Sequence, residues 1–265
     1  MLAKADPIHW SNQVAKPIIV GQGPNRVIAL HGWFGSSNAW RHFADVVDVR
    51  NFTYVFPDYR GYGSRMDEPG RYTIEEIAAD TLELADQLGW DTFNIVGHSM
   101  GGKAMQRILA DAPTRVKKLV GVTPVPASGV PFDEETWAFF STAWSERSTR
   151  ETIINNTTGQ RLSKAWVAKM AGQSLSYSKP EAVAGYLTAW VKGDFAPAIQ
   201  GNPVPIKVII GRNDPAINPD VMKGTYMAWY PNAQLEIIEG AGHYPMDEAP
   251  VSLATSIERF LASEG

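Results

Sequence analysis

Residues 94–102 read NIVGHSMGG: an apolar run ends at Gly97, Ser99 follows two positions later, and two more glycines come after it. The apolar run predicts a strand, and the residues after Ser99 predict a helix with one apolar face. A serine on so sharp a strand-to-helix turn adopts a strained backbone conformation, and glycine neighbours leave the room that the turn needs. This stretch fits either a nucleophile whose oxygen stands clear of the sheet or an N-cap serine, which is common at helix starts.

The composition is that of a globular protein. The chain has 265 residues, 44% of them hydrophobic, which is enough for one large domain or for a core with an insertion. A net charge of -4, without a cluster of Lys and Arg, argues against a nucleic-acid partner. The absence of cysteine excludes disulfides, thiolate metal sites and cysteine nucleophiles.

The sequence predicts no membrane partner. Residues 1–10 contain no apolar stretch of signal-peptide length. No window approaches the roughly 18 apolar residues of a membrane-spanning helix. We therefore expect a soluble, cytoplasmic protein, and nothing in the sequence predicts an oligomeric state.

Short apolar runs alternate with helical patterns along most of the chain. Runs typical of strands that are covered on both faces lie at residues 26–30, 53–56, 92–96, 116–122, 206–210 and 235–238. The helical pattern after the second run begins with a capping box at Thr73 and Glu76 and stops at Gly89. The last pattern has Pro250 in its first turn. This alternation predicts an α/β fold with a mostly parallel, doubly wound sheet and helices on both faces.

Residues 125–202 interrupt this alternation. The segment shows helical patterns but no convincing strand, and prolines bound it on both sides; Trp137, Phe140 and Trp144 are spaced as one helical face. The predicted division is an α/β core of residues 1–124 and 203–265 and a helical cap, or lid, of residues 125–202. In one interpretation this insertion only adds core and stability. In the other interpretation it is a lid, which its insertion at the loop edge of the predicted sheet favours.

The serine needs a base, because a hydroxyl is a poor nucleophile until its proton is removed. Histidine is the expected base. His243 lies in the sequence GAGHYP directly after the last strand, where a glycine-rich loop presents its ring over the edge of the sheet. The other histidines fit other roles: a surface position for His9, packing or exposure for His42, a side chain that points away from the serine for His98, and loop shaping for His31.

The base in turn needs an acid that fixes its tautomer and stabilises the imidazolium. Asp214 follows the strand at residues 206–210, in the sequence GRNDP. Aspartate before proline is often only a turn former. However, the order Ser99, Asp214, His243 is the nucleophile–acid–base order of one fold class. The remaining nearby acids fit helix N-termini, where carboxylates stabilise the dipole: Asp220, the nearest substitute for Asp214, and Asp247 and Glu248.

A third loop, HGWFG, follows the strand at residues 26–30. In acyl transfer the attacked carbonyl becomes an oxyanion that needs two aligned donors, and the backbone N–H groups of Trp33 and Met100 are the candidates. The candidate walls of an apolar substrate pocket are Phe34, His98, Trp137, Phe140, Trp144 and Trp190. The histidines lack metal-ligand spacing and no phosphate-binding glycine loop is present, so neither a metal nor an organic cofactor is predicted.

Five motifs together resemble the α/β-hydrolase fold superfamily. They are HGWFG at residues 31–35, DYRGYGS at 58–64, GHSMGG at 97–102, GRNDP at 211–215 and GAGHYP at 240–245. The resemblance implies Ser99 as nucleophile, Asp214 as acid and His243 as base, with a structural role for DYRGYGS. Dehalogenases and epoxide hydrolases of this fold place aspartate where this chain has Ser99, so the resemblance argues against those reactions.

The resemblance is strongest to small bacterial carboxylesterases, although lactonases, amide hydrolases and perhydrolases share the same parts. We therefore expect a serine hydrolase that cleaves carboxylic esters or lactones of small to medium apolar groups through an acyl-enzyme. The expected partner is a small-molecule ester. The alternatives are a C–C bond hydrolase, a lyase or a cofactor-free oxygenase that uses only His243 and Asp214, and a ligand receptor that signals through its lid.

Overall fold

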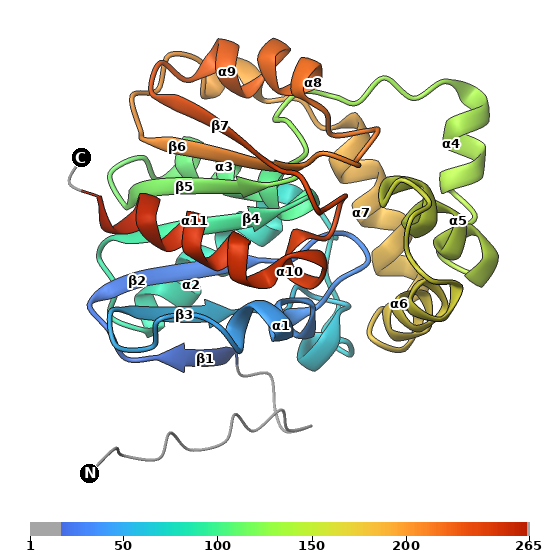
Figure 1. Ribbon diagram of the computed structural model, residues 1–265, viewed down its shortest axis with the longest axis horizontal. Helices are drawn as coiled ribbons and strands as arrows, with labels where there is room; N and C mark the ends of the chain where they lie inside the picture. The colour runs from blue at the N-terminus through green and yellow to red at the C-terminus, as the bar shows by residue number, and fades with distance from the viewer. Residues whose placement is uncertain (1–16, 264–265) are drawn as a thin grey trace.

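A seven-stranded sheet forms the centre of the molecule, in the order β1-β3-β2-β4-β5-β6-β7 (Figure 1). The structure is a computed structural model that describes residues 17–263, so His9 lies outside the described residues. The strands are β1 (Ile18–Gly21), β2 (Asn25–Leu30), β3 (Phe52–Phe56), β4 (Phe93–His98), β5 (Val116–Val122), β6 (Ile206–Gly211) and β7 (Ala233–Ile238). All neighbouring strands run parallel except β1, which pairs antiparallel with β3.

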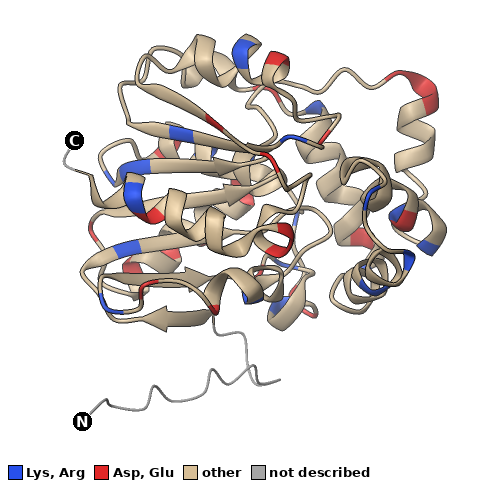
Figure 2. Cartoon of the chain, viewed as in Figure 1, with Lys and Arg blue, Asp and Glu red and all other residues tan. Residues whose placement is uncertain are grey.

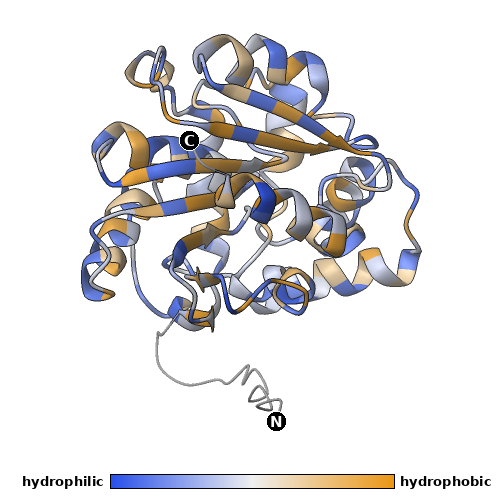
Figure 3. Cartoon of the chain, turned by 60° about the vertical axis from the view of Figure 1, so that its left-hand side comes forward, coloured by the Kyte–Doolittle hydropathy of each residue, from blue (hydrophilic) through white to orange (hydrophobic). Residues whose placement is uncertain are grey.

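Helices cover both faces of the sheet, and the alternation within β2 shows how. Ile28 and Leu30 belong to the apolar cluster under α2 (Ile74–Gln87) and α3 (Met100–Asp111). Val27 and Ala29 belong to the cluster under α1 (Arg41–Ala44) and α11 (Pro250–Ala262). The strands are accordingly hydrophobic along most of their length (Figure 3). The prediction of a mostly parallel, doubly wound α/β sheet is confirmed.

The boundaries of α2 follow the local sequence signals. Thr73 caps the helix by accepting the backbone N–H of Glu76 at 3.2 Å. The Glu76 carboxylate satisfies the free N–H groups of Tyr72 and Arg71, which lie one and two residues upstream of Thr73, the partner in a standard capping box. Gly89 ends the helix with a φ of 65°, a left-handed conformation that favours glycine.

Four helices are inserted between β5 and β6, and we call them the inserted helices: α4 (Glu134–Phe140), α5 (Arg147–Thr157), α6 (Lys164–Ser176) and α7 (Pro180–Lys192). In Figure 1 they lie beyond the carboxyl ends of the parallel strands. The shorter elements are η1 (Ser37–Trp40), η2 (Gly63–Arg65), η3 (Ala196–Ala198), α8 (Pro219–Gly224), α9 (Tyr226–Trp229) and α10 (Pro245–Glu248). The structure thus places the insertion at the edge of the sheet where the loops after the strands converge.

A buried lysine ties both ends of the insertion to α3. The Lys103 ammonium donates to the carbonyls of Ser128, Trp190 and Gly193, at 2.9, 2.9 and 2.5 Å. Burial lowers the pKa of Lys103 to about 8. Because Ser128 precedes the inserted helices and Gly193 follows them, one ammonium group holds their entry and exit together.

Along the chain, Lys and Arg residues are interspersed with Asp and Glu residues in both the core and the inserted helices (Figure 2). Within residues 17–263, no helix combines the length and the apolar character needed to cross a membrane.

Candidate active site

Ser99 sits on the turn between β4 and α3 with a φ of 52° and a ψ of −116°. Such a conformation costs a non-glycine residue roughly 1–3 kcal/mol. The residues two positions before and after Ser99 must be glycine. A Cβ on Gly97 would lie 2.4 Å from the carbonyl oxygen of Gly101, and a Cβ on Gly101 would lie 2.5 Å from the carbonyl oxygen of Leu30. The Ser99 side chain makes no capping bond to α3. The geometry therefore separates this serine from an ordinary N-cap.

A hydrogen-bonded chain joins Ser99, His243 and Asp214. His243 Nε2 lies 3.0 Å from Ser99 Oγ, and His243 Nδ1 lies 2.5 Å from Asp214 Oδ2. The other Asp214 oxygen accepts the backbone N–H groups of Ala216 and Ile217 at 2.9 and 3.1 Å, which orients the buried carboxylate. In this arrangement the histidine can take the hydroxyl proton while the carboxylate stabilises the resulting imidazolium.

The loop that carries His243 is held from two sides. His98 Nε2 and Thr123 Oγ1 both donate to the His243 carbonyl, at 2.8 and 2.9 Å. Burial, and next the neighbouring His243, hold the pKa of His98 well below its usual value, so the ring is neutral and its one N–H serves this bond. His98 also lines the cavity, while its Nε2 holds the backbone of His243.

Glu248 holds the same loop from α10. Its carboxylate accepts the backbone N–H groups of Gly242 at 2.8 Å and Tyr244 at 3.0 Å, the residues on either side of His243. It also pairs with Arg161. The sequence assigned Glu248 to the start of the last helix, but the structure places it in the separate short helix α10 with its carboxylate on the His243 loop. Its α10 neighbour Asp247 likewise precedes the last helix.

The HGWFG loop passes directly over the serine. A Cβ on Gly32 would lie 2.7 Å from His98 Nδ1 and 3.1 Å from the Cβ of Ser99, so a glycine lets the loop pass this close to both. Within residues 17–263 the backbone N–H groups of Trp33 and Met100 donate to no protein acceptor. Tyr62 fixes the loop by donating its hydroxyl to the Trp33 carbonyl at 2.9 Å. These two free amides flank the serine and can serve a developing negative charge.

His31 supports the loop from below as a neutral ring. Burial lowers its pKa to about 4, although Asp58 partly opposes the shift. The ring stacks on Tyr59 at a centroid distance of 3.8 Å, and the Tyr59 hydroxyl donates to the His31 carbonyl at 2.8 Å. The carboxylate of Asp58 accepts the backbone N–H of Ser64 at 2.8 Å. The DYRGYGS segment is thus tied to the loop beside Ser99.

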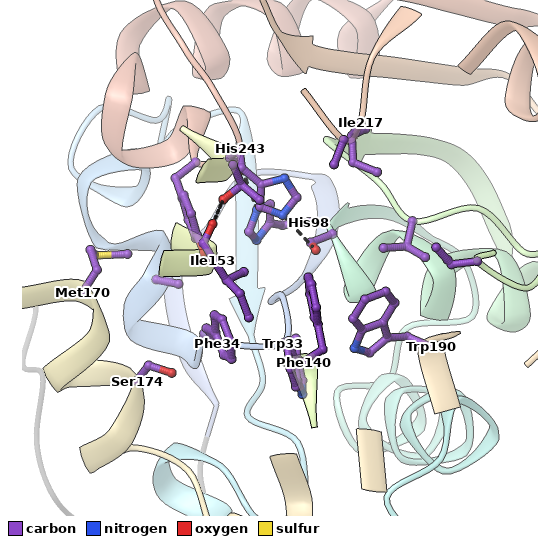
Figure 4. A pocket seen from close by; sticks show the side chains of 18 of the residues that line it. Trp33, Phe34, His98, Phe140, Ile153, Met170, Ser174, Trp190, Ile217 and His243 are labelled. Atoms are coloured by element: carbon purple, nitrogen blue, oxygen red, sulfur yellow. Dashed lines mark hydrogen bonds between the residues drawn. The ribbon is translucent and has the colours of Figure 1, made fainter. Parts of the chain in front are cut away.

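A cavity of about 670 Å³ opens above Ser99 and His243, within the size range of small-molecule sites (Figure 4). The sequence placed four residues in its wall that the structure also places there: Phe34, His98, Phe140 and Trp190. Trp33 and Phe34 stack at 4.3 Å, and Trp190 meets Trp33 edge-on at 5.6 Å. The side of the cavity next to the Trp33 amide is therefore aromatic.

The expectation for two tryptophans was wrong. Trp137 lies outside the cavity wall, with the Lys192 ammonium 4.1 Å from its ring centre. Trp144 is 45% exposed. The reason is that α4 ends at Phe140, so Trp144 does not continue the helical face that its spacing suggested.

The sequence reasoning missed other wall residues, because neither the loop sequences nor the helical patterns show which side chains face the cavity. They include Phe132, Ile153, Met170, Ser174 and Ile217. Asp220 and Asp247 also line the cavity, away from the Asp214–His243 bond. Burial, and next the neighbouring Glu248, raise the pKa of Asp247 to about 7. No group of three or more potential metal ligands occurs among residues 17–263.

Comparison with known proteins agrees with this geometry. The family model described as alpha/beta hydrolase fold matches residues 25–250. Esterase YbfF of Escherichia coli (strain K12) is 27% identical over 89% of this chain and 92% of its own length. Fluoroacetate dehalogenase of Burkholderia sp. is 31% identical over 41% of this chain and 37% of its own length. The solved esterase EaEST of Exiguobacterium antarcticum matches with a TM-score of 0.83 and 18% identity, covering 92% of this chain and 94% of that one.

Proposed function

This chain belongs to the alpha/beta hydrolase fold family, and from that premise we propose that it is a serine hydrolase of carboxylic esters or lactones. The observation that carries the proposal is the Ser99–His243–Asp214 chain, with a distance of 3.0 Å between Ser99 Oγ and His243 Nε2. Hydrolysis is the activity that family membership supports. The serine at the elbow favours acyl transfer over dehalogenation or epoxide opening, because the enzymes of this fold that catalyse those two reactions place an aspartate there.

The proposed reaction proceeds through an acyl-enzyme. His243 Nε2 takes the Ser99 proton as Ser99 Oγ bonds to the substrate carbonyl carbon, and the backbone N–H groups of Trp33 and Met100 bind the oxyanion. His243 then returns the proton to the leaving oxygen as the carbon–oxygen bond breaks. Water repeats the sequence on the acyl-enzyme and releases the acid. We propose that the inserted helices form the cap over this site, and that their aromatic side chains receive an apolar group.

The decisive experiment is substitution of the serine. Ser99→Ala removes the nucleophile, so turnover of p-nitrophenyl esters should fall by up to about a million-fold. Ser176→Ala is the matched control, because Ser176 is an exposed residue near the end of α6 whose hydroxyl bonds the Gln173 carbonyl at 2.8 Å. A fluorophosphonate probe should label the wild type on Ser99 and leave the variant unlabelled.

Two other outcomes would replace the proposal. A lyase or cofactor-free oxygenase that needs only His243 and Asp214 would keep its activity in Ser99→Ala and lose it in His243→Ala. A receptor would bind its ligand in both variants without turnover. Full ester hydrolysis by a correctly folded Ser99→Ala protein would also refute the serine mechanism.

A further inference from the structure

A buried arginine that has no carboxylate partner within residues 17–263 lies behind one wall of the cavity. Arg150 on α5 is 1% exposed. Among the described residues its guanidinium bonds only neutral acceptors, which are the Ala143 carbonyl at 2.7 Å, the Ser174 hydroxyl at 2.7 Å, the Ser178 hydroxyl at 3.1 Å and the Trp144 carbonyl at 3.5 Å. Burial lowers its pKa, which reflects the unfavourable free energy of this isolated charge. A buried charge without a counter-charge is costly and is seldom kept without a use.

The positive charge reaches the cavity through two wall residues. The guanidinium carbon lies 5.3 Å from the ring centre of Phe34, and Nη1 donates to Ser174 Oγ. Because the Ser174 oxygen accepts this bond, its own proton must point elsewhere, and it has no protein acceptor within residues 17–263. Figure 4 shows the Ser174 oxygen directed toward Phe34 and the interior of the site. A hydroxyl polarised by a cation is a strong donor for an anion.

The cavity wall carries charged side chains of both signs. Ser174 shares α6 with Lys169, which also lines the cavity. The acidic wall residues Asp220 and Asp247 come from α8 and α10 instead. Phe34 directly follows Trp33, whose amide is the proposed binding point of the substrate carbonyl. The Ser174 hydroxyl and the Arg150 guanidinium behind Phe34 therefore lie next to the position from which the acyl group extends.

We propose that Ser174, backed by Arg150, forms a subsite for a carboxylate at the far end of the acyl group. The substrate class is then a half-ester of a dicarboxylic acid, with an apolar stretch along the aromatic wall and the anion at the Ser174 hydroxyl. This inference rests on the proposed ester hydrolysis for its substrate, but the subsite itself can be measured without turnover.

The test compares matched esters. Mono-p-nitrophenyl adipate, pimelate and suberate are each paired with a neutral ester in which an isopropyl group replaces the carboxylate, and spontaneous hydrolysis is subtracted with Ser99→Ala. At one or more of these chain lengths, the wild-type kcat/KM should be higher for the ester that carries the carboxylate than for its neutral counterpart. Ser174→Ala should lower the ratio of the two kcat/KM values about tenfold, since a hydrogen bond to a charged group is involved. Ser176→Ala should leave the ratio unchanged.

Binding gives a second readout that does not depend on catalysis. The monomethyl esters of the same acids are titrated calorimetrically into Ser99→Ala, and Ser174→Ala in that background should weaken binding about tenfold. A wild type that hydrolyses the neutral esters but shows no carboxylate preference at any length overturns the subsite and leaves the proposed function standing. A preference that survives Ser174→Ala also overturns it. Carboxylate binding without any ester hydrolysis would retain the subsite and reject the proposed function.

Discussion

Substitution of Glu248 by glutamine tests whether the base is positioned from outside the catalytic chain. The two Glu248 oxygens accept the backbone N–H groups of Gly242 at 2.8 Å and Tyr244 at 3.0 Å, so they bracket His243. Glutamine keeps one acceptor and turns an NH₂ group toward the other N–H. The variant thus loses a charge-assisted bond worth about 1.5–3 kcal/mol and gains an unpaired donor.

The effect on catalysis follows from the distance that this loop sets. His243 Nε2 must stay near 3.0 Å from Ser99 Oγ to take its proton. A displacement of about 1 Å in a reacting group can cost on the order of 100-fold in rate. We therefore expect kcat to fall between about tenfold and 100-fold, with little change in KM because Glu248 is not expected to contact substrate.

The assay is steady-state hydrolysis of a p-nitrophenyl ester by the wild type, Glu248→Gln and Glu258→Gln. Glu258 is the matched control, because its carboxylate also accepts a backbone N–H, from Asp48 at 2.7 Å, but on another loop. Thermal unfolding confirms that each variant is folded. An unchanged kcat in folded Glu248→Gln would refute the argument, as would an equal loss in Glu258→Gln.

Two further predictions concern the loop over the serine. Tyr62→Phe removes the hydroxyl that donates to the Trp33 carbonyl at 2.9 Å. We expect urea titration to show a free energy of unfolding that is lower by about 1 kcal/mol, and we expect kcat to be about tenfold lower. A kcat equal to that of the wild type would contradict the positioning role. The second concerns pH and His31, whose pKa is about 4 in the folded protein against 6.5 for a free side chain. Between these values the unfolded chain binds a proton that the folded protein excludes, so this stabilisation is complete above pH 6.5 and is lost as the pH falls toward 4, up to about 3 kcal/mol. Urea titrations at pH 7 and 4.5 should show a smaller loss in His31→Asn than in the wild type, and equal losses would reject the assignment.

The sheet could be predicted from the sequence because its signals are local. Most of the parallel strands are largely apolar runs, and the runs at residues 26–30, 53–56, 92–96 and 206–210 are followed directly by a histidine, a proline or a glycine. The functional loops begin at these ends. Ser99, Asp214 and His243 could be predicted for the same reason, since parallel strands bring their carboxyl ends to one edge. The short edge strand Ile18–Gly21 was missed because four residues carry too little pattern.

Helix α5, the arrangement of the inserted helices and the supporting contacts could not be predicted, because they depend on tertiary packing. In α5 the sequence RSTRETIINNT has few apolar residues, and Arg150 is buried where the pattern of a helix would require an apolar side chain. Glu248 looked like a helix-start acid because its partners in the His243 loop are backbone N–H groups, which leave no trace in the sequence. The error at Trp144 arose because residue spacing does not show where a helix ends.

The contacts of the HGWFG loop make substrate recognition and catalysis interdependent in this protein. The indole N–H of Trp33 donates to the Val183 carbonyl of α7 at 2.8 Å, and Arg150 of α5 stacks on Phe34. The backbone N–H of the same tryptophan is the proposed oxyanion donor. Any substrate that shifts α5 or α7 therefore also moves an oxyanion donor, and donors of this kind are worth about 3 kcal/mol of barrier each. Substrates that fit the inserted helices poorly should consequently lose kcat as well as affinity, because binding under these helices and alignment of the oxyanion donor depend on the same two residues.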